Sequence, residues 1–139
     1  MITFSEDKKI WVPWMRRSIQ LALLAEGMTS PNPLVGAIVL DSNGKLVGEG
    51  YHLGAGNPHA EIEALAQAGE KSFDGTIVVT LEPCCHQGLT PPCTGEIIKA
   101  GLKKVVIGMV DPDPRVSGKG ISRLKESGIE VIQGVLNQE

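Results

Sequence analysis

The chain has 139 residues, of which 42% are hydrophobic and 21% charged, and its formal net charge is −3. That length suits one compact domain, and the composition is ordinary for a soluble globular protein. No stretch gathers enough Lys and Arg to follow a phosphate backbone, which disfavours a nucleic-acid partner. The apolar runs are too short to span a membrane, and the charged N-terminus is unlike a signal peptide.

Only three cysteines occur, and two of them are adjacent, Cys84 and Cys85. An odd number argues against a disulfide framework. It favours a reducing, cytoplasmic setting in which thiolates bind metal or remain free.

The first predicted helix begins at Pro13, whose missing amide suits a helix start, and ends before Gly27. Its apolar residues at helical spacing should face the core: Met15, Ile19, Ala22 and Leu23. Two predicted strands follow, over 36–40 and 45–50. Asn43-Gly44 between these apolar runs predicts a hairpin.

Asn57 and Pro58 are expected to be the N-cap and first residue of a second helix, which covers 59–68. The remaining predicted elements are strands over 76–81, 105–109 and 129–133 and helices over 90–100 and 118–127. A leading hairpin followed by alternating strands and helices predicts a mixed five-stranded sheet with helices on both faces. The loops after Leu81 and Val110 should lie at the carboxyl edge of that sheet, where binding sites usually form.

Four residues near that edge form a candidate metal centre: His59, Glu61, Cys84 and Cys93. Two residues along a regular helix are about 200° apart, so His59 and Glu61 can share a site only within the first turn. Cys93 follows two prolines at a helix start, where the helix dipole favours a thiolate. One imidazole and two thiolates are an ordinary zinc complement, and they leave the fourth position for water.

Each of these residues has an ordinary explanation when taken singly. An isolated cysteine is usually a small buried hydrophobe, and a glutamate in a first turn usually complements the helix dipole. Together they predict hydrolysis, because zinc lowers the pKa of its water from ~15.7 toward ~7. Glu61 would carry the proton to a ring nitrogen and then to departing ammonia.

The His-Ala-Glu and Pro-Cys segments resemble the His-x-Glu…Pro-Cys pattern of zinc-dependent nucleobase deaminases. Eight residues, 85–92, separate Cys84 from Cys93, whereas other deaminases carry Pro-Cys-x-x-Cys. This long loop resembles the deaminase domain of the bacterial riboflavin-biosynthesis deaminase-reductase. The resemblance runs from about Trp14 to Val135 and includes segments 31–37, 48–52, 81–93, 111–114 and 116–121.

The resemblance implies the cytidine-deaminase-like fold, a three-layer α/β/α sandwich. It also implies a zinc-dependent hydrolase that removes the 2-amino group of 2,5-diamino-6-(5-phosphoribosylamino)pyrimidin-4-one. The zinc ligands and the proton shuttle that it implies are His59, Cys84, Cys93 and Glu61. The implied substrate contacts are Asn32, His52, Cys85 and His86. Three of these contacts have other readings: Asn32 could shape a turn, His52 end a strand and His86 be an ordinary loop histidine.

Two features depart from the family pattern. Leu89 stands where relatives usually carry Lys or Arg, a residue that would help hold the ribose phosphate. No reductase domain follows Glu139, so residues 1–139 are expected to form a single zinc-dependent deaminase domain. That domain could stand alone or belong to a longer protein.

The expected partners are a phosphorylated pyrimidine and further copies of the chain, as a dimer or tetramer, with no nucleic acid and no membrane.

Three other functions stay open. The chain could deaminate another small amino-heterocycle, such as a nucleoside, cytosine or guanine, which the departure at Leu89 permits. An editing deaminase acting on RNA or DNA would need a basic surface and stacking aromatics, but aromatic residues make up only 4% of the chain. A non-catalytic zinc module would need a fourth protein ligand, for which Cys85 or His86 could serve.

Overall fold

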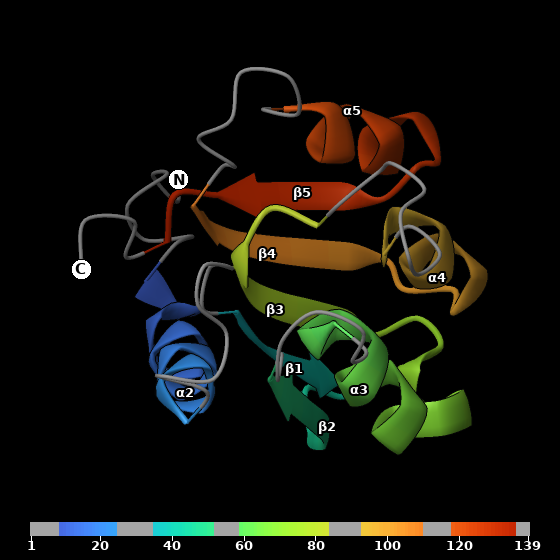
Figure 1. Cartoon of the computed structure of the whole chain (residues 1–139). Coiled ribbons are helices and arrows are strands. Elements are labelled where there is room, and N and C mark those ends of the chain that lie inside the picture. The colour runs from blue at the N-terminus through green and yellow to red at the C-terminus, as the bar shows by residue number, and fades with distance from the viewer. Residues whose placement is uncertain (1–8, 25–34, 52–58, 84–92, 110–117, 136–139) are drawn as a thin grey trace.

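A computed structural model describes residues 9–24, 35–51, 59–83, 93–109 and 118–135 (Figure 1). The helices are α2 (Val12–Leu23), α3 (Ala60–Ala68), the short 3₁₀ helix η1 (Gly69–Ser72), α4 (Cys93–Lys99) and α5 (Lys119–Glu126). The strands are β1 (Gly36–Leu40), β2 (Leu46–Tyr51), β3 (Thr76–Leu81), β4 (Lys104–Met109) and β5 (Glu130–Gln133). None of the helices in these described ranges has the length and apolar character needed to cross a membrane.

The strands form one mixed sheet in the order β2-β1-β3-β4-β5. β1 is antiparallel to both β2 and β3, while β3, β4 and β5 run parallel. The parallel pairs are joined by crossovers that contain α4 and α5, as parallel strands require. The predicted five-stranded mixed sheet is therefore confirmed.

Alternate residues of the strands pack against helices on opposite faces of the sheet. Ile38, Val78 and Val106 lie in the core beneath α2. Val39 and Val79 belong to the opposite core, which α3, α4 and α5 cover (Figure 1). β1 is buried along its whole length. Helices on both faces make the three-layer α/β/α sandwich that was expected.

The boundaries and inner face of the first helix differ from the prediction. α2 begins at Val12 and ends at Leu23, and Leu23 is 52% exposed rather than packed inward. Ser18, which was not expected on the inner face, is fully buried there, and its hydroxyl donates a hydrogen bond to the carbonyl of Val78. Leu23 follows the buried Ala22 by 100° of helix rotation, which carries it off the face that contacts the sheet.

α3 lies directly on β2 because both carry small residues at the contact. A Cβ added at Gly48 would be 2.2 Å from the carbonyl oxygen of Ala64, and one added at Gly50 would be 2.5 Å from that of Ala60. On the helix, Ala60, Ala64 and Ala68 recur every four residues and are buried. Glycine on the strand and alanine on the helix therefore set how closely α3 approaches the sheet.

The predicted hairpin between β1 and β2 is present, and an aspartate organises its turn. The Asp41 carboxylate accepts hydrogen bonds from the backbone amides of Lys45, at 3.0 Å, and Asn43, at 2.9 Å. The Lys45 hydrogen bond is the largest influence that holds the pKa of Asp41 below its ordinary value, and the Asn43 hydrogen bond acts in the same direction. The charged form of Asp41 is thus favoured in the folded hairpin.

We expect Gly50→Ala to lower the free energy of unfolding by about 1–3 kcal/mol, because the added methyl must push α3 away from β2. Urea denaturation measures the change. Ala66→Leu enlarges an exposed residue of the same helix and should change stability by no more than about 0.5 kcal/mol. Equal stability of the Gly50→Ala variant and the wild type would contradict a close-contact constraint.

We also expect acid to remove part of the hairpin's stability. A carboxylate whose pKa is lowered by folding stabilises the protein above its unfolded pKa of about 3.9, and that contribution is lost as the pH falls through the lower folded value. Asp41→Asn keeps an acceptor oxygen but cannot titrate. The stability difference between wild type and Asp41→Asn, followed by urea denaturation from neutral to acid pH, should shrink on acidification. A pH-independent difference would contradict this reading.

Candidate active site

His59 and Glu61 lie at the start of α3. His59 is the N-cap, with extended backbone angles of φ −69° and ψ 160°. The expected N-cap, Asn57, was therefore wrong, and the helix begins at Ala60. Because an N-cap residue lies outside the regular helical rotation, the 200° separation between His59 and Glu61 does not apply here. Glu61, the second helical residue, is only 4% exposed.

Cys93 lies at the start of α4, as the sequence predicted. Its side chain is fully buried. The Sγ atom of Cys93 lies 3.1 Å from Nδ1 of His59, although 34 positions separate the two residues in the sequence. The starts of α3 and α4 therefore meet at one point, and they bring an imidazole and a thiol into contact.

The position of Cys93 at a helix start favours the metal-binding form of its side chain. A helix N-terminus carries partial positive charge, which stabilises the thiolate of a cysteine in the first turn. The ring nitrogen facing the sulfur is Nδ1, so this is the atom of His59 that would bind an ion. Tetrahedral zinc bonds of the usual lengths place a nitrogen and a sulfur ligand about 3.6 Å apart. The observed Nδ1–Sγ distance of 3.1 Å is close to this ligand–ligand separation. Imidazole nitrogen and thiolate sulfur are also donor types that zinc binds.

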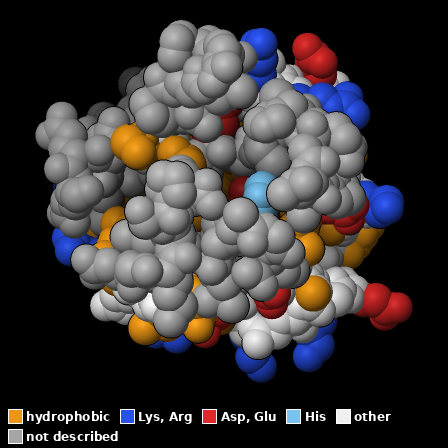
Figure 2. All heavy atoms as spheres, viewed as in Figure 1, with side chains coloured by type: hydrophobic (Ala, Val, Ile, Leu, Met, Phe, Trp, Pro, Cys, Tyr) orange, Lys and Arg blue, Asp and Glu red, His pale blue; other side chains and the backbone are white. Residues whose placement is uncertain are grey.

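Histidine atoms reach the surface beside acidic atoms on the face of the molecule shown in Figure 2. His59 is partly exposed, whereas Glu61 and Cys93 are buried. A buried carboxylate two residues along the chain from this imidazole is shielded from bulk water and can exchange protons with a bound reactant.

The parallel strands β3 and β4 end together, since Leu81 pairs with Met109. Glu82 follows directly and is 5% exposed. Its carboxylate accepts hydrogen bonds from the backbone amides of Gly118, at 3.0 Å, and Ile121, at 3.1 Å. Sequence reasoning gave Glu82 no role. The available signal was a carboxylate placed between a buried strand and a proline.

Several predicted site residues lie outside the described ranges: Asn32, His52, Cys84, Cys85 and His86. The same holds for Leu89. Within the described residues no group of three or more His, Cys, Asp or Glu side chains is arranged to hold a metal ion. The structure thus brings together two of the three expected ligands, His59 and Cys93. The third, Cys84, directly follows Pro83, which is the last described residue before it.

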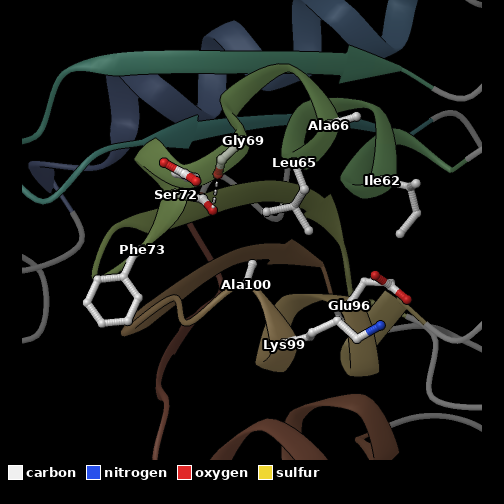
Figure 3. Close-up of a pocket in the computed structure, with 10 residues that line it drawn as sticks. Ile62, Leu65, Ala66, Gly69, Ser72, Phe73, Glu96, Lys99 and Ala100 are labelled. Atoms are coloured by element: carbon white, nitrogen blue, oxygen red, sulfur yellow. Dashed lines mark hydrogen bonds between the residues drawn. The ribbon is translucent and has the colours of Figure 1, made fainter.

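A groove of about 630 Å³ runs between α3 and α4. Phe73 lies at one end of the groove and Ile62 at the other, and the remaining apolar lining comes from Leu65, Ala66 and Ala100 (Figure 3). Glu96 and Lys99 line it from α4. None of the described residues that line it is a histidine or cysteine, and neither His59 nor Cys93 belongs to the lining.

Comparison with known proteins finds a match between residues 10–109 and the zinc-binding region of cytidine and deoxycytidylate deaminases. The chain is 57% identical over 121 residues to the riboflavin biosynthesis protein RibD of a Synechocystis species, covering 87% of this chain and 33% of that protein. It is 52% identical over 126 residues to the diaminohydroxyphosphoribosylamino-pyrimidine deaminase of Buchnera aphidicola, covering 91% of this chain and 85% of that enzyme.

Among solved structures, Acinetobacter baumannii RibD superposes with a TM-score of 0.92 at 47% identity, covering 95% of this chain and 37% of that one. The chain spans about a third of the length of the first curated relatives that it matches. These similarities confirm the resemblance that the sequence motifs indicated, and they confirm the fold.

Proposed function

Since the chain belongs to the cytidine and deoxycytidylate deaminase family, and within it to the pyrimidine deaminases of riboflavin biosynthesis, we propose that it is a hydrolytic aminopyrimidine deaminase. Its proposed substrate is 2,5-diamino-6-(5-phosphoribosylamino)pyrimidin-4-one, which loses its 2-amino group as ammonia. The observation that carries the proposal is the 3.1 Å contact between His59 and Cys93, made at two helix starts beside the buried Glu61.

Three residues would hold a zinc ion in this proposal: His59 through Nδ1, Cys93 through its sulfur, and Cys84. Support comes from the donor types, from the position of Cys93 at a helix start, and from the zinc-binding region that the family match covers. When bound, zinc supplies Lewis-acid activation of a water molecule. One imidazole and two thiolates satisfy three of its four usual positions.

Glu61 is the proposed proton carrier. Its carboxylate is held in the first turn of α3, two residues after His59, and it is shielded from solvent. In hydrolytic deamination the water oxygen becomes the new carbonyl oxygen and gives up both of its protons, one to the ring nitrogen and one to the amino group, which leaves as ammonia. A single carboxylate in contact with all three positions can perform these transfers in sequence.

Four residues are proposed to contact the substrate on the strength of the family resemblance: Asn32, His52, Cys85 and His86.

The ribose phosphate needs a cationic partner, which Leu89 cannot supply. Two amides at the start of α5 are already hydrogen-bonded to Glu82, so the phosphate is not expected to bind to them. Lys119 is exposed at the first residue of α5 and is a candidate for this role. A basic group from a second copy of the chain is an alternative.

We further propose that residues 1–139 act as one deaminase domain in the cytoplasm and assemble as a dimer or tetramer. The two cores pack on opposite faces of one continuous sheet, which supports a single folding unit. The odd cysteine count supports a reducing compartment. Cross-linking or sedimentation of the purified chain would determine its assembly state.

We expect Glu61→Gln to lower turnover by about 10²–10⁴-fold while zinc content stays unchanged, because the amide cannot carry a proton. The measurement is ammonia release from the phosphorylated diaminopyrimidinone and from its dephosphorylated form. Glu63→Gln alters an exposed carboxylate in the same turn and should leave turnover unchanged. Zinc-loaded wild type that deaminates neither compound would exclude this substrate and favour another amino-heterocycle.

We expect Cys84→Ser and Cys93→Ser to weaken zinc binding by at least about 100-fold, the upper end of the loss caused by removing an outer-shell partner. Cys85→Ser is the matched control, because it alters the adjacent cysteine and should retain one zinc per chain. Zinc content and chelator competition provide the readout. Loss of zinc from Cys85→Ser would instead identify a fourth protein ligand and favour the non-catalytic zinc module.

A further inference from the structure

We propose that Glu82 is a positioning residue for the metal centre, which holds the backbone leading into Cys84 against the start of α5. The inference rests on the proposed function, because it takes Cys84 to be a zinc ligand. Glu82 and Pro83 are buried and are the last described residues before Cys84. Whatever fixes their backbone therefore limits where the Cys84 sulfur can lie.

The start of α5 lacks a capping side chain of its own. Its N-cap is Gly118, and its first turn contains no acidic residue. In an ordinary capping box, side chains at the N-cap and at the third helical residue satisfy each other's amides. Here Glu82 serves both amides from another element, since one carboxylate oxygen accepts from Gly118 and the other from Ile121. Hydrogen bonds between a carboxylate and backbone amides at a helix start are charge-assisted and reinforced by the dipole.

Close steric contact holds the same segment from a second direction. A Cβ added at Gly120 would lie 2.1 Å from the carbonyl oxygen of Pro83 and 3.2 Å from Oε2 of Glu82. The first turn of α5 therefore rests directly on the Glu82–Pro83 backbone, with no room for a side chain between them. This close approach keeps both amides within reach of the carboxylate.

The backbone of Glu82 is also tied to the sheet. Its amide donates a hydrogen bond of 2.8 Å to the carbonyl of Met109, at the end of β4. The residue is thus fixed to β4 through its main chain and to α5 through its side chain. Metal centres require their ligands to be held within about 0.5 Å of the productive geometry. In this proposal, Glu82 supplies this restraint for the backbone that leads into Cys84.

The test compares Glu82→Gln with wild type in the zinc-loaded chain. Glutamine has the same size, but its single carbonyl oxygen leaves one of the two amides facing an NH₂ group. Zinc affinity, measured by chelator competition, should fall by about 10–100-fold. With cobalt in place of zinc, the thiolate-to-metal absorption bands should change in position or intensity, which reports altered ligand geometry directly.

Ser18→Ala is the matched control for general loss of stability. It removes a buried hydrogen bond from α2, on the opposite face of the sheet, so the melting temperature should fall while zinc affinity and the cobalt spectrum stay as in wild type. If Glu82→Gln melts lower but binds zinc as tightly as wild type, with the same cobalt spectrum, Glu82 only anchors α5 and the proposal is overturned.

Glu82→Asp provides a second route, because it keeps the charge but withdraws the carboxylate by one methylene. Like Glu82→Gln, it should lower the affinity for zinc. If Glu82→Gln cannot be recovered folded, the zinc affinity of Glu82→Asp tests the proposal by itself. Wild type that binds zinc but deaminates no pyrimidine would refute the proposed substrate and leave the role of Glu82 standing. Wild type that binds no zinc would overturn both.

Discussion

The backbones of α3 and β2 lie in direct contact through small residues, and the arrangement of the site depends on this contact. Gly48 and Gly50 leave no atoms between the strand and the carbonyls of Ala64 and Ala60. Because closely packed interiors transmit displacement rather than absorb it, the helix cannot slide or tilt without collision. His59, the residue that caps this helix, is thereby held at the edge of the sheet.

The starts of α3 and α4 meet at the His59–Cys93 contact, and the start of α5 lies where β3 and β4 end. α3 presents His59, α4 presents Cys93, and α5 is held by the carboxylate of Glu82. Each start carries partial positive charge, so the region favours thiolate and carboxylate side chains. The apolar layers beneath are built from β-branched strand residues and contribute stability rather than chemistry. This separation lets the core be rigid while the reactive groups lie on its rim.

The buried carboxylates of Glu61 and Glu82 have different surroundings and therefore different proposed roles. Glu82 accepts hydrogen bonds from two backbone amides of α5, which suits a structural restraint. Glu61 lies in the first turn of α3, two residues beyond the imidazole that contacts Cys93. Proton transfer needs a carboxylate next to the reacting groups, so position relative to the imidazole–thiol pair distinguishes the two better than burial does.

Local patterns in the sequence determined the element order, the hairpin and the residue types of the site, because periodicity, turn residues and metal-ligand chemistry depend on near neighbours. They misplaced the N-cap at Asn57 and the inner face at Leu23, where a shift of one or two residues changes the result. Only the tertiary structure decided that His59 meets Cys93 and that Glu82 caps α5, across 34, 36 and 39 positions of chain. Such contacts depend on how closely helices approach the sheet, which is set by packing between distant segments.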